Sequence, residues 1–357
     1  MNRIAVNTAN EFDNYVDTYS MPRYPIGWYG LLLSSELQRD KPKTLSYFGR
    51  ELVAFRDEAG APVVVDAYCP HMGAHLGRGG SVVNGTITCP FHGWQFNNQG
   101  NCVNAPFALK TPASERTQLK TYPADEKNGV IFVWFHIKDE QPTYFIPEID
   151  ELKTQSWLPW GKLRKIIRTH VQEIRENFCD ESHFKFIHQQ EMPADIGWWT
   201  DGPRAFHKCM ITWKYFRLFG LKSDRFNFES TSTFYGPGVL VTHTSGLMKY
   251  ITIGLANPIN DSHCEFRLIG TSRRKSKFFP LLALINRRVL MQTARRDIEE
   301  ECEIWSHKRY VEKPIFQSHE RSIQKFRKWY QQFYEGYHQQ QVPSIASDHI
   351  PLRIVNN

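Results

Sequence analysis

The sequence predicts an α+β protein in which a small all-β domain precedes a larger domain of antiparallel sheet covered by helices. Its 357 residues exceed the length of about 250–300 residues at which a single hydrophobic core stops growing. Short strand-like segments separated by Asn/Gly turns run from about residue 45 to 137, and helical periodicity appears only later. Hydrophobic residues make up 41% and aromatic residues 14% of the chain, which excludes a disordered protein.

The turns of the first domain predict short antiparallel strands. Asn84-Gly85 is a strong hairpin signal because both residues tolerate the positive φ of a two-residue turn. Asn97–Gly100 and Asn128-Gly129 supply further turns of this kind. Several short strands joined by tight turns indicate a small β-sandwich or barrel. The expected strands are Glu51–Arg56, Pro62–Tyr68, Ser81–Val83, Thr86–Thr88, Gln95–Phe96, Cys102–Val103 and Val130–Ile137.

The segment Asp139–Leu158 carries Pro142 and Pro147 and is expected to separate the two domains. We expect an N-terminal arm at residues 1–25, a first domain at 26–145, a second at 146–340 and a C-terminal tail at 341–357. The strands expected in the second domain are Thr231–Tyr235, Val239–His243 and Ile251–Leu255. The expected helices lie at about Leu281–Lys308 and Ile323–Tyr337.

Charge and hydropathy exclude several classes of protein. The net charge is +7, but the basic clusters Lys162–Arg168, Arg273–Lys277 and Ser322–Lys328 are scattered. No nucleic-acid-binding motif accompanies them, so we expect no nucleic acid and interpret them as solvated faces or a docking surface for an acidic redox partner. Without an apolar run of about 18 residues or a signal-peptide core, the protein is expected to be cytoplasmic. Arg273–Arg288 allows at most a peripheral membrane contact.

Two Cys/His pairs in the first domain predict a metal site. Cys69-Pro70-His71 and, after 17 intervening residues, Cys89-Pro90-Phe91-His92 each follow an expected strand on a glycine-containing turn. Structural zinc usually takes pairs spaced by about two to four residues, whereas a single residue separates Cys69 from His71. In a Rieske centre, two thiolates hold one iron of a [2Fe-2S] cluster and two imidazoles hold the other. The spacing therefore favours a Rieske cluster over zinc or unliganded buried residues.

A second group of polar residues, in the following domain, predicts another metal site. Asn177, Asp180 and His183 recur every third residue, so on a helix they lie near one edge. His183 and His188 are about 140° apart on an ideal helix and can reach one ion only if the helix bends, widens or ends between them. Non-haem Fe(II) oxygenases use two histidines and one carboxylate on one face of the iron. Taken alone, the two histidines also fit a buried core pair.

The third ligand is expected from the distant helix Leu290–Trp305. At about 100° per residue, one arc of this helix forms an apolar, inward face. It consists of Leu290, Ala294, Ile298, Glu301 and Trp305. Glu301 lies inside this face and Asp297 at its margin, while Glu299 and Glu303 point away. An acid on an inward face needs a partner, and iron is one. Glu301 is therefore the first candidate and Asp297 the second.

These motifs resemble those of the Rieske non-haem iron oxygenases over most of residues 26–335. The resemblance implies a Rieske domain followed by a helix-grip catalytic domain. The implied ligands are Cys69, His71, Cys89 and His92 for a [2Fe-2S] cluster, and His183, His188 and Glu301 for mononuclear Fe(II). Glu301 stands where relatives carry an Asp. Asn177 and Asp180 are the expected catalytic residues, Asp180 through hydrogen bonds to His183 and to His92 of a neighbouring subunit.

Shorter segments resemble the ketosteroid hydroxylase oxygenase components, the Rieske cholesterol desaturases and aminopyrrolnitrin oxygenase. Among them are Trp28-Tyr29, Phe48-Gly49-Arg50, Ile304–Lys308 and Phe326–Tyr330. The resemblance implies a homotrimeric terminal oxygenase of a Rieske monooxygenase system. It would use O2 and electrons from a separate NAD(P)H-dependent flavin/iron–sulfur reductase to oxidise a small, largely apolar, polycyclic and steroid-like substrate.

Other interpretations stay open at this point. One is an arylamine N-oxygenase or an oxidative cyclase of secondary metabolism. Another is a Rieske electron-transfer protein without mononuclear iron. A group of aromatic residues in the second domain either lines a substrate pocket or forms ordinary core. They are Trp198, Trp199, Phe206, Trp213, Tyr215 and Phe216.

Overall fold

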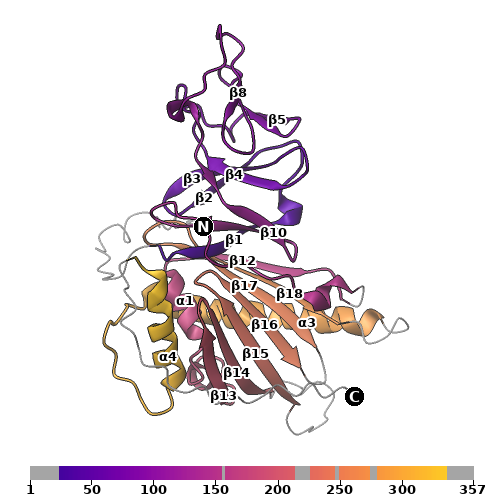
Figure 1. The fold of residues 1–357 in the computed structure, drawn as a ribbon. Helices are drawn as coiled ribbons and strands as arrows, with labels where there is room; N and C mark the ends of the chain where they lie inside the picture. Colours follow the sequence, from indigo (N-terminus) through magenta and orange to yellow (C-terminus); the bar gives the residue numbers. More distant parts are fainter. Residues whose placement is uncertain (1–23, 155–156, 214–225, 246–248, 274–279, 336–357) are drawn as a thin grey trace, which may run out of the picture.

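The computed structural model describes residues 24–154, 157–213, 226–245, 249–273 and 280–335. The N-terminal domain contains three small sheets, and the C-terminal domain is built around one seven-stranded sheet. Figure 1 shows the N-terminal domain stacked on the C-terminal domain. Strand pairs in both domains are antiparallel. The α+β architecture expected from the sequence is thereby confirmed. The expected arm up to residue 23 and the expected tail at 341–357 lie outside the described residues.

The three sheets of the N-terminal domain have the strand orders β1-β11-β10, β2-β3-β4-β9 and β5-β6-β7-β8. The first contains β1 (Gly27–Leu33), β10 (Ala124–Lys127) and β11 (Val130–Phe135). The second contains β2 (Lys43–Tyr47), β3 (Arg50–Arg56), β4 (Pro62–Asp66) and β9 (Thr121–Tyr122). The third contains β5 (Ser81–Val83), β6 (Thr86–Thr88), β7 (Gln95–Phe96) and β8 (Cys102–Asn104). Short 3-10 helices lie at Ser34–Glu36 and Glu115–Thr117.

The hairpins form where their turn residues predicted them. Asn84 and Gly85 both have positive φ, 48° and 71°, between the paired strands β5 and β6. A Cβ atom on Gly85 would lie 2.0 Å from the backbone nitrogen of Glu58, so only glycine fits this turn. Strands β1, β2, β9 and β10 were not expected from the sequence. Every residue of β1 is buried, so this strand lacks the alternation of polar and apolar residues that identifies a strand with one solvated face.

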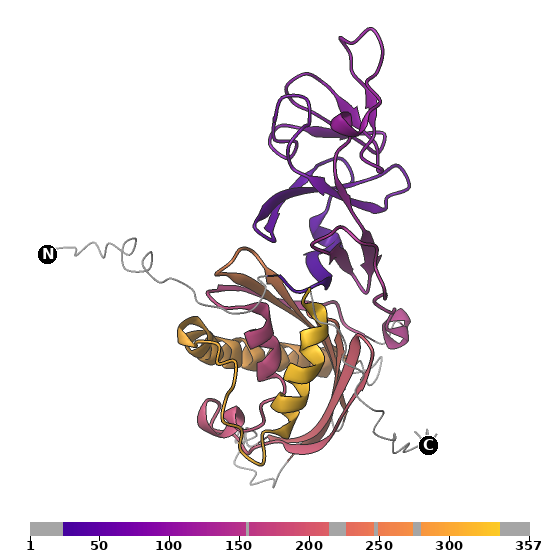
Figure 2. The same cartoon turned by 60° about the vertical axis from the view of Figure 1, so that its left-hand side comes forward.

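The sheet of the C-terminal domain has the order β12-β18-β17-β16-β15-β14-β13. Its strands are β12 (Gly161–Ile167), β13 (Ala194–Asp201), β14 (Arg204–Trp213), β15 (Phe226–Tyr235), β16 (Val239–Ser245), β17 (Tyr250–Pro258) and β18 (Cys264–Ser272). The helices are α1 (Val171–Asn177), α2 (His183–Phe186), α3 (Pro280–His307) and α4 (Arg321–Tyr330), with 3-10 helices at Asp150–Lys153 and Gln331–Phe333. Figures 1 and 2 show α1, α3 and α4 together on one face of the sheet, which curves around them.

Helix α3 has the inward face that its periodicity predicted. Ile298, Glu301 and Trp305 are 6%, 6% and 2% exposed. The side chains of Glu299 and Glu303 on the opposite side are 49% and 81% exposed. Among the described residues, α3 and the other helices are too short or too polar to cross a membrane. The helix expected to reach residue 337 ends earlier, because α4 gives way to a 3-10 turn after residue 330.

The two domains share one hydrophobic core. Tyr29 of β1 belongs to the same buried cluster as Phe266 of β18 and Trp305 of α3. On the same strand, the carbonyl of Gly30 accepts a hydrogen bond from the side-chain amide of Asn257 on β17 at 2.9 Å. Burial of apolar surface from both domains in one cluster stabilises their contact as it stabilises each domain. The relative position of the two domains is therefore part of the fold.

A buried charge network joins the domains beside this core. Glu265 on β18 is fully buried and forms ion pairs with Arg164 and Arg267. Its carboxylate also accepts a hydrogen bond from the Tyr47 hydroxyl of the N-terminal domain at 2.7 Å. Arg267 in turn lies 2.6 Å from the carboxylate of Glu36, again in the N-terminal domain. Removing one member of such a network leaves a buried charge without its counter-charge.

Replacing the central carboxylate tests this network. Glu265→Ala is expected to lower the free energy of unfolding by about 3–5 kcal/mol, because Arg267 then stays buried with a lost partner. Arg164→Ala removes a partner whose side chain is 59% exposed, so we expect a loss of about 1 kcal/mol or less. Urea denaturation followed by tryptophan fluorescence measures both variants. Equal losses would contradict the central role of Glu265.

Candidate metal centres

Two loops with the same backbone pattern carry the Cys/His pairs of the N-terminal domain. In each loop, the cysteine N–H donates to the carbonyl five residues further on, at 2.9 Å for Cys69 and 2.8 Å for Cys89. The N–H of Gly73 or Gly93, four residues after the cysteine, donates back to the cysteine carbonyl at 2.9 and 3.1 Å. Both glycines have positive φ, 73° and 71°, a conformation that other residues rarely adopt. The glycine-containing turns expected from the sequence are present.

The four side chains of these loops differ in burial according to their donor type. Cys69 and Cys89 are buried, 2% and 3% exposed, whereas His71 is exposed and His92 is half-buried. The two imidazole rings lie 4.8 Å apart between centroids. Burial and the neighbouring Cys89 thiol raise the pKa of the Cys69 thiol to about 11, so iron binding there would release the proton of Cys69. Paired thiols inside and paired imidazoles outside fit the donor set of a Rieske cluster.

A single zinc ion fits this arrangement less well. Several groups of three or more donors in the described part of the chain have all their ligand atoms within 4.8 Å of one another. The four residues of these loops do not form such a group.

His75, which the motif leaves out, accepts a hydrogen bond from the Gly77 N–H at its Nδ1 atom, at 3.1 Å. Its ring packs edge-on against Tyr68, 5.2 Å away between centroids. His75 therefore has a structural place beside the loops.

In the C-terminal domain, Asn177, Asp180 and His183 do not lie on one continuous helix, so they do not share the helix edge that their spacing would give. Helix α1 ends at Asn177, and α2 begins at His183. Between them, the Asp180 carboxylate accepts hydrogen bonds from the Ser182 N–H at 3.0 Å and the Ser182 hydroxyl at 2.6 Å. Aspartate favours such local bonds to the chain over a helix interior. Because α2 ends before His188, the two histidines are not held about 140° apart as they would be on an ideal helix.

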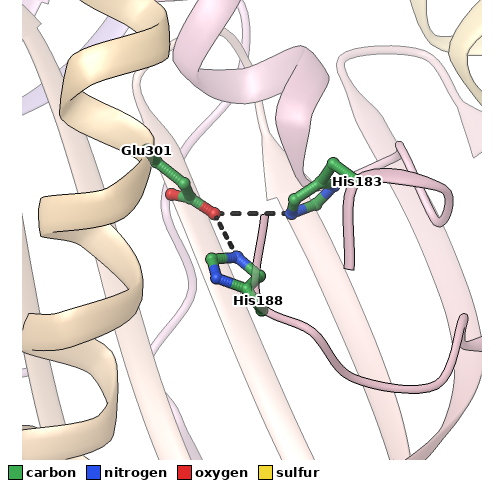
Figure 3. A group of neighbouring side chains, drawn as sticks. All are labelled: His183, His188 and Glu301. Carbon is green, nitrogen blue, oxygen red and sulfur yellow. Dashed lines mark hydrogen bonds and ion pairs between the residues drawn. The ribbon is translucent and has the colours of Figure 1, made fainter. Parts of the chain in front are cut away.

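The interruption of the helix between α1 and α2 brings both histidines to the buried face of α3 (Figure 3). Oε1 of Glu301 lies 3.1 Å from Nε2 of His188 and 3.4 Å from Nε2 of His183. The same oxygen accepts a hydrogen bond from the side-chain amide of Asn177 at 2.9 Å. All three members of this group, which we call the His–His–Glu site, are buried. Two imidazole nitrogens and one carboxylate are the donor set of a non-haem Fe(II) site.

Hydrogen bonds to the other ring nitrogens orient both histidines. Nδ1 of His183 pairs with the main-chain carbonyl of Asp180, and Nδ1 of His188 lies 2.9 Å from the Glu300 carboxylate. A donor hydrogen on each Nδ1 leaves each Nε2 lone pair free for a metal ion. The hydrogen bond expected between the Asp180 carboxylate and the His183 ring is not formed. That carboxylate lies 4.0 Å from Nδ1 and instead accepts hydrogen bonds from Ser182.

Asp297, the second candidate for the third ligand, faces a different atom. Its carboxylate lies 3.8 Å from Nδ1 of His188, on the side of the ring turned away from Glu301. Burial raises the pKa of Asp297 to about 6. Burial also opposes the charge on Glu301, but the hydrogen bonds from His183 and His188 outweigh it and lower the Glu301 pKa. Of the two acids, Glu301 is the one held charged between the two Nε2 atoms.

The protonation of His188 follows from the same contacts. Burial alone would lower its pKa, but the hydrogen bonds to Glu301 and Glu300 raise it to about 9. Without a metal, His188 is therefore protonated on both ring nitrogens and positively charged at neutral pH. Glu300 was not expected as a partner from the sequence, because helical periodicity assigns only the inward arc of α3 to the site. Glu300 flanks that arc, and its side chain is 34% exposed.

A cavity of about 240 Å³ extends from the His–His–Glu site between α3 and the sheet. Leu290, Ala294 and Ile298 of α3 line one wall. The aromatic residues expected as a possible pocket are elsewhere where they are described. Trp198 packs against the buried cluster of Phe234 and Trp329, while Trp199 stacks on Phe206 and is 46% exposed. The side chain of Trp213 and residues Tyr215 and Phe216 lie outside the described part.

Two family models match successive parts of the chain. Residues 27–123 match the model described as the Rieske [2Fe-2S] domain. Residues 133–334 match the model described as the 3-Ketosteroid 9alpha-hydroxylase C-terminal domain. These two segments contain the Cys/His loops and the His–His–Glu site respectively.

Curated relatives extend this similarity over most of the chain. Cholesterol 7-desaturase nvd of Xenopus laevis is 31% identical over 339 residues, covering 88% of this chain and 73% of the relative. The Drosophila melanogaster protein of the same name is 32% identical, covering 88% and 76%. The oxygenase component of 3-ketosteroid-9-alpha-monooxygenase of Rhodococcus rhodochrous is 30% identical over 322 residues, covering 87% and 82%.

Solved structures share the fold at low sequence identity. Dicamba monooxygenase bound to dicamba superposes with a TM-score of 0.63 at 15% identity, covering 86% of this chain and 96% of that one. An NdmA variant of Pseudomonas putida CBB5 with caffeine gives a TM-score of 0.67 at 16% identity, covering 85% and 89%. Together with the family models and the curated relatives, this identifies the chain as an oxidoreductase of the Rieske oxygenase family, with a Rieske [2Fe-2S] domain followed by a catalytic domain of the 3-ketosteroid 9α-hydroxylase type.

Proposed function

We propose that the protein is the terminal oxygenase of a Rieske monooxygenase system, which uses O2 and electrons from a separate reductase to oxidise a largely apolar, polycyclic, steroid-like substrate. The observation that carries the proposal is the buried Glu301 carboxylate between two imidazole Nε2 atoms, at the end of a cavity. Two relatives support the substrate class, since their names specify cholesterol and a 3-ketosteroid. The words "oxygenase component" in one of those names support a separate reductase.

Each metal group has its own residues in this proposal. Cys69 and Cys89 would hold one iron of the Rieske cluster, and His71 and His92 the other. His183, His188 and Glu301 would hold mononuclear iron. When bound, the cluster would supply one-electron transfer and the mononuclear iron would supply O2 activation. An electron carrier without mononuclear iron has no need of a buried carboxylate between two histidines, so that alternative is the weaker one.

The remaining residues of the site position these ligands and shield them from water. Asn177 donates to Oε1 of Glu301 and holds this carboxylate toward the two histidines. The carbonyl of Asp180 and the carboxylate of Glu300 fix the ring orientations of His183 and His188. The apolar wall of α3 limits the access of water to the oxidised carbon of a substrate in the cavity.

We also propose that the active unit is a homotrimer in which the cluster of one subunit reduces the iron of the next. Within one chain, the β5–β8 sheet lies at the end of the molecule opposite the catalytic sheet (Figure 1), and electron transfer decays steeply with distance. Two apolar side chains beside the cluster loops, Met72 and Phe91, are 66% and 60% exposed. Phe186, close to Asp180 in the sequence, is 80% exposed. These surfaces suit contact between subunits, with Asp180 near a cluster histidine.

Metal analysis tests the ligand assignment. The wild type is expected to contain about three irons and two acid-labile sulfides per chain. His183→Ala and Glu301→Ala are each expected to lose the mononuclear iron and all turnover, while the visible spectrum of the cluster is unchanged. Asp297→Ala is expected to keep three irons. Loss of iron in Asp297→Ala but not in Glu301→Ala would assign the third ligand to Asp297, and two irons in the reconstituted wild type would favour an electron carrier.

Iron affinity should depend on pH through His188. Its pKa of about 9 means that Fe(II) must displace a proton below that pH. The affinity of metal-free protein for Fe(II), measured by anaerobic titration, is therefore expected to rise about tenfold per pH unit between pH 7 and 8.5. Glu300→Gln removes a bond that raises this pKa, so its affinity should change less over the same range. An affinity of the wild type that is independent of pH would contradict this account.

Sedimentation analysis tests the trimer. The wild type is expected to have about three times the 41.8 kDa mass of one chain. Phe91→Glu places a charge in the proposed contact and should weaken both assembly and the transfer of electrons from the reduced cluster to mononuclear iron. Val83→Glu on the β5–β6 hairpin, 47% exposed, is the matched control and should behave as the wild type. A monomer with full turnover would contradict the proposed assembly.

A further inference from the structure

The cavity beside the His–His–Glu site has a floor of hydroxyl side chains. Ser230 and Ser232 of β15, Thr242 and Thr244 of β16, and Thr252 of β17 all line it, and we call this group the hydroxyl floor. Strand register places its members side by side, because Ser230 pairs with Thr244, and Thr242 pairs with both Ser232 and Thr252. Alternate residues of a strand face the same side of a sheet, so the five hydroxyls form one patch.

Three of these hydroxyls have no partner in the described part of the chain. Ser232 and Thr242 bond to each other at 3.0 Å between their oxygens. The hydroxyls of Ser230, Thr244 and Thr252 make no hydrogen bond to another described residue, and Ser230 is 4% exposed. Because they line the cavity, these hydroxyls can donate hydrogen bonds to a molecule inside it. An oxygen atom of a ligand in the cavity would provide that partner.

The charges around the cavity restrict the kind of oxygen. Four carboxylates contribute to the lining: Asp180, Glu181, Asp297 and Glu301. Among the described lining residues there is no lysine or arginine. Three histidines line the cavity as well, but each already has a carboxylate partner: His183 and His188 face Glu301, and His207 lies 3.0 Å from Glu181. A carboxylate or sulfate group of a ligand at the hydroxyl floor would therefore lose its water without gaining an unpaired cation among the described lining residues. A ketone or alcohol oxygen carries no such cost.

The length of the cavity sets the shape of the ligand. Leu290 and Glu301 both line it and are eleven residues apart on α3, which corresponds to about 16 Å of helix. At the Leu290 end, that side chain packs against Phe228 and Tyr250. Tyr250 is the register partner of Thr244, so this part of the hydroxyl floor lies toward the end of the cavity away from Glu301. An extended rigid molecule can therefore touch both regions.

We propose that Ser230, Thr244 and Thr252 bind a neutral oxygen, of a ketone or an alcohol, carried by an elongated apolar substrate at a position remote from the oxidised carbon. The same cavity rejects carboxylic acids. This inference rests on the proposed function and adds to it the chemistry of the substrate's polar group and the residues that select it.

Binding of three probes with one tetracyclic skeleton tests the inference. They are the hydrocarbon 5α-androstane, its 17-ketone and its 17β-carboxylic acid. Equilibrium binding to the oxidised holoenzyme without O2 is followed by quenching of tryptophan fluorescence. The ketone is expected to bind about 3- to 10-fold more tightly than the hydrocarbon for each hydrogen bond gained, and at least about tenfold more tightly than the acid.

Variants of the hydroxyl floor assign the effect to named residues. Ser230→Ala, Thr244→Val and Thr252→Val should weaken binding of the ketone about 3- to 10-fold each and leave the affinity for the hydrocarbon unchanged. Thr231→Val, on the opposite face of β15, is the matched control and should leave both affinities as in the wild type. Unchanged metal content of all four variants shows that the fold and the iron site are intact.

Several outcomes would overturn the inference. They are equal affinities of the wild type for ketone and hydrocarbon, tightest binding of the acid, equal weakening of ketone and hydrocarbon in the variants, and no binding of any probe. Failure of the proposed function is separate. It would appear as a wild type that prefers the ketone but consumes no O2 with any of the probes when a reductase and NADH are supplied.

Discussion

The catalytic domain is organised around one buried carboxylate, that of Glu301. Removing a carboxylate from water is costly unless positive charge or hydrogen-bond donors replace the solvent. Here two imidazoles and the Asn177 amide surround a single oxygen atom of Glu301. The end of α1, the turn that Asp180 closes and the start of α2 all serve to bring these donors to it. A ferrous ion would take the place of the proton that His188 carries in the metal-free chain.

The shared core of the two domains explains why this acid is inward-facing. Trp305, one turn after Glu301 on α3, is 2% exposed and packs in the cluster that also contains Tyr29 of the N-terminal domain. The packing of Trp305 therefore fixes the rotation of α3 about its axis, and residues one turn apart share that face. The Glu265 network holds the same two domains together through charges. Domain contact and ligand position thus depend on each other.

The fold does not determine the substrate. Proteins solved with dicamba and with caffeine superpose on this chain at 15% and 16% identity. One fold thus occurs in proteins solved with very different molecules, so recognition depends on the side chains that a given chain carries in its cavity. In this chain the cavity has hydroxyls on β15, β16 and β17 opposite an apolar helix wall. That combination suits a neutral, mostly apolar molecule.

Features encoded by short-range spacing were determined by the sequence itself. The cluster loops, the Asn84-Gly85 hairpin and the inward position of Glu301 follow from local turn chemistry and helical periodicity, and the structure has all three. Only the tertiary structure decided which groups meet across the chain. Asn177 reaches Glu301 across 124 residues and His188 reaches Glu300 across 112, and no local pattern encodes such pairs. The break after α1, the fully buried β1 and the hydroxyl floor likewise depend on packing and strand register, because burial and long-range pairing override local preference.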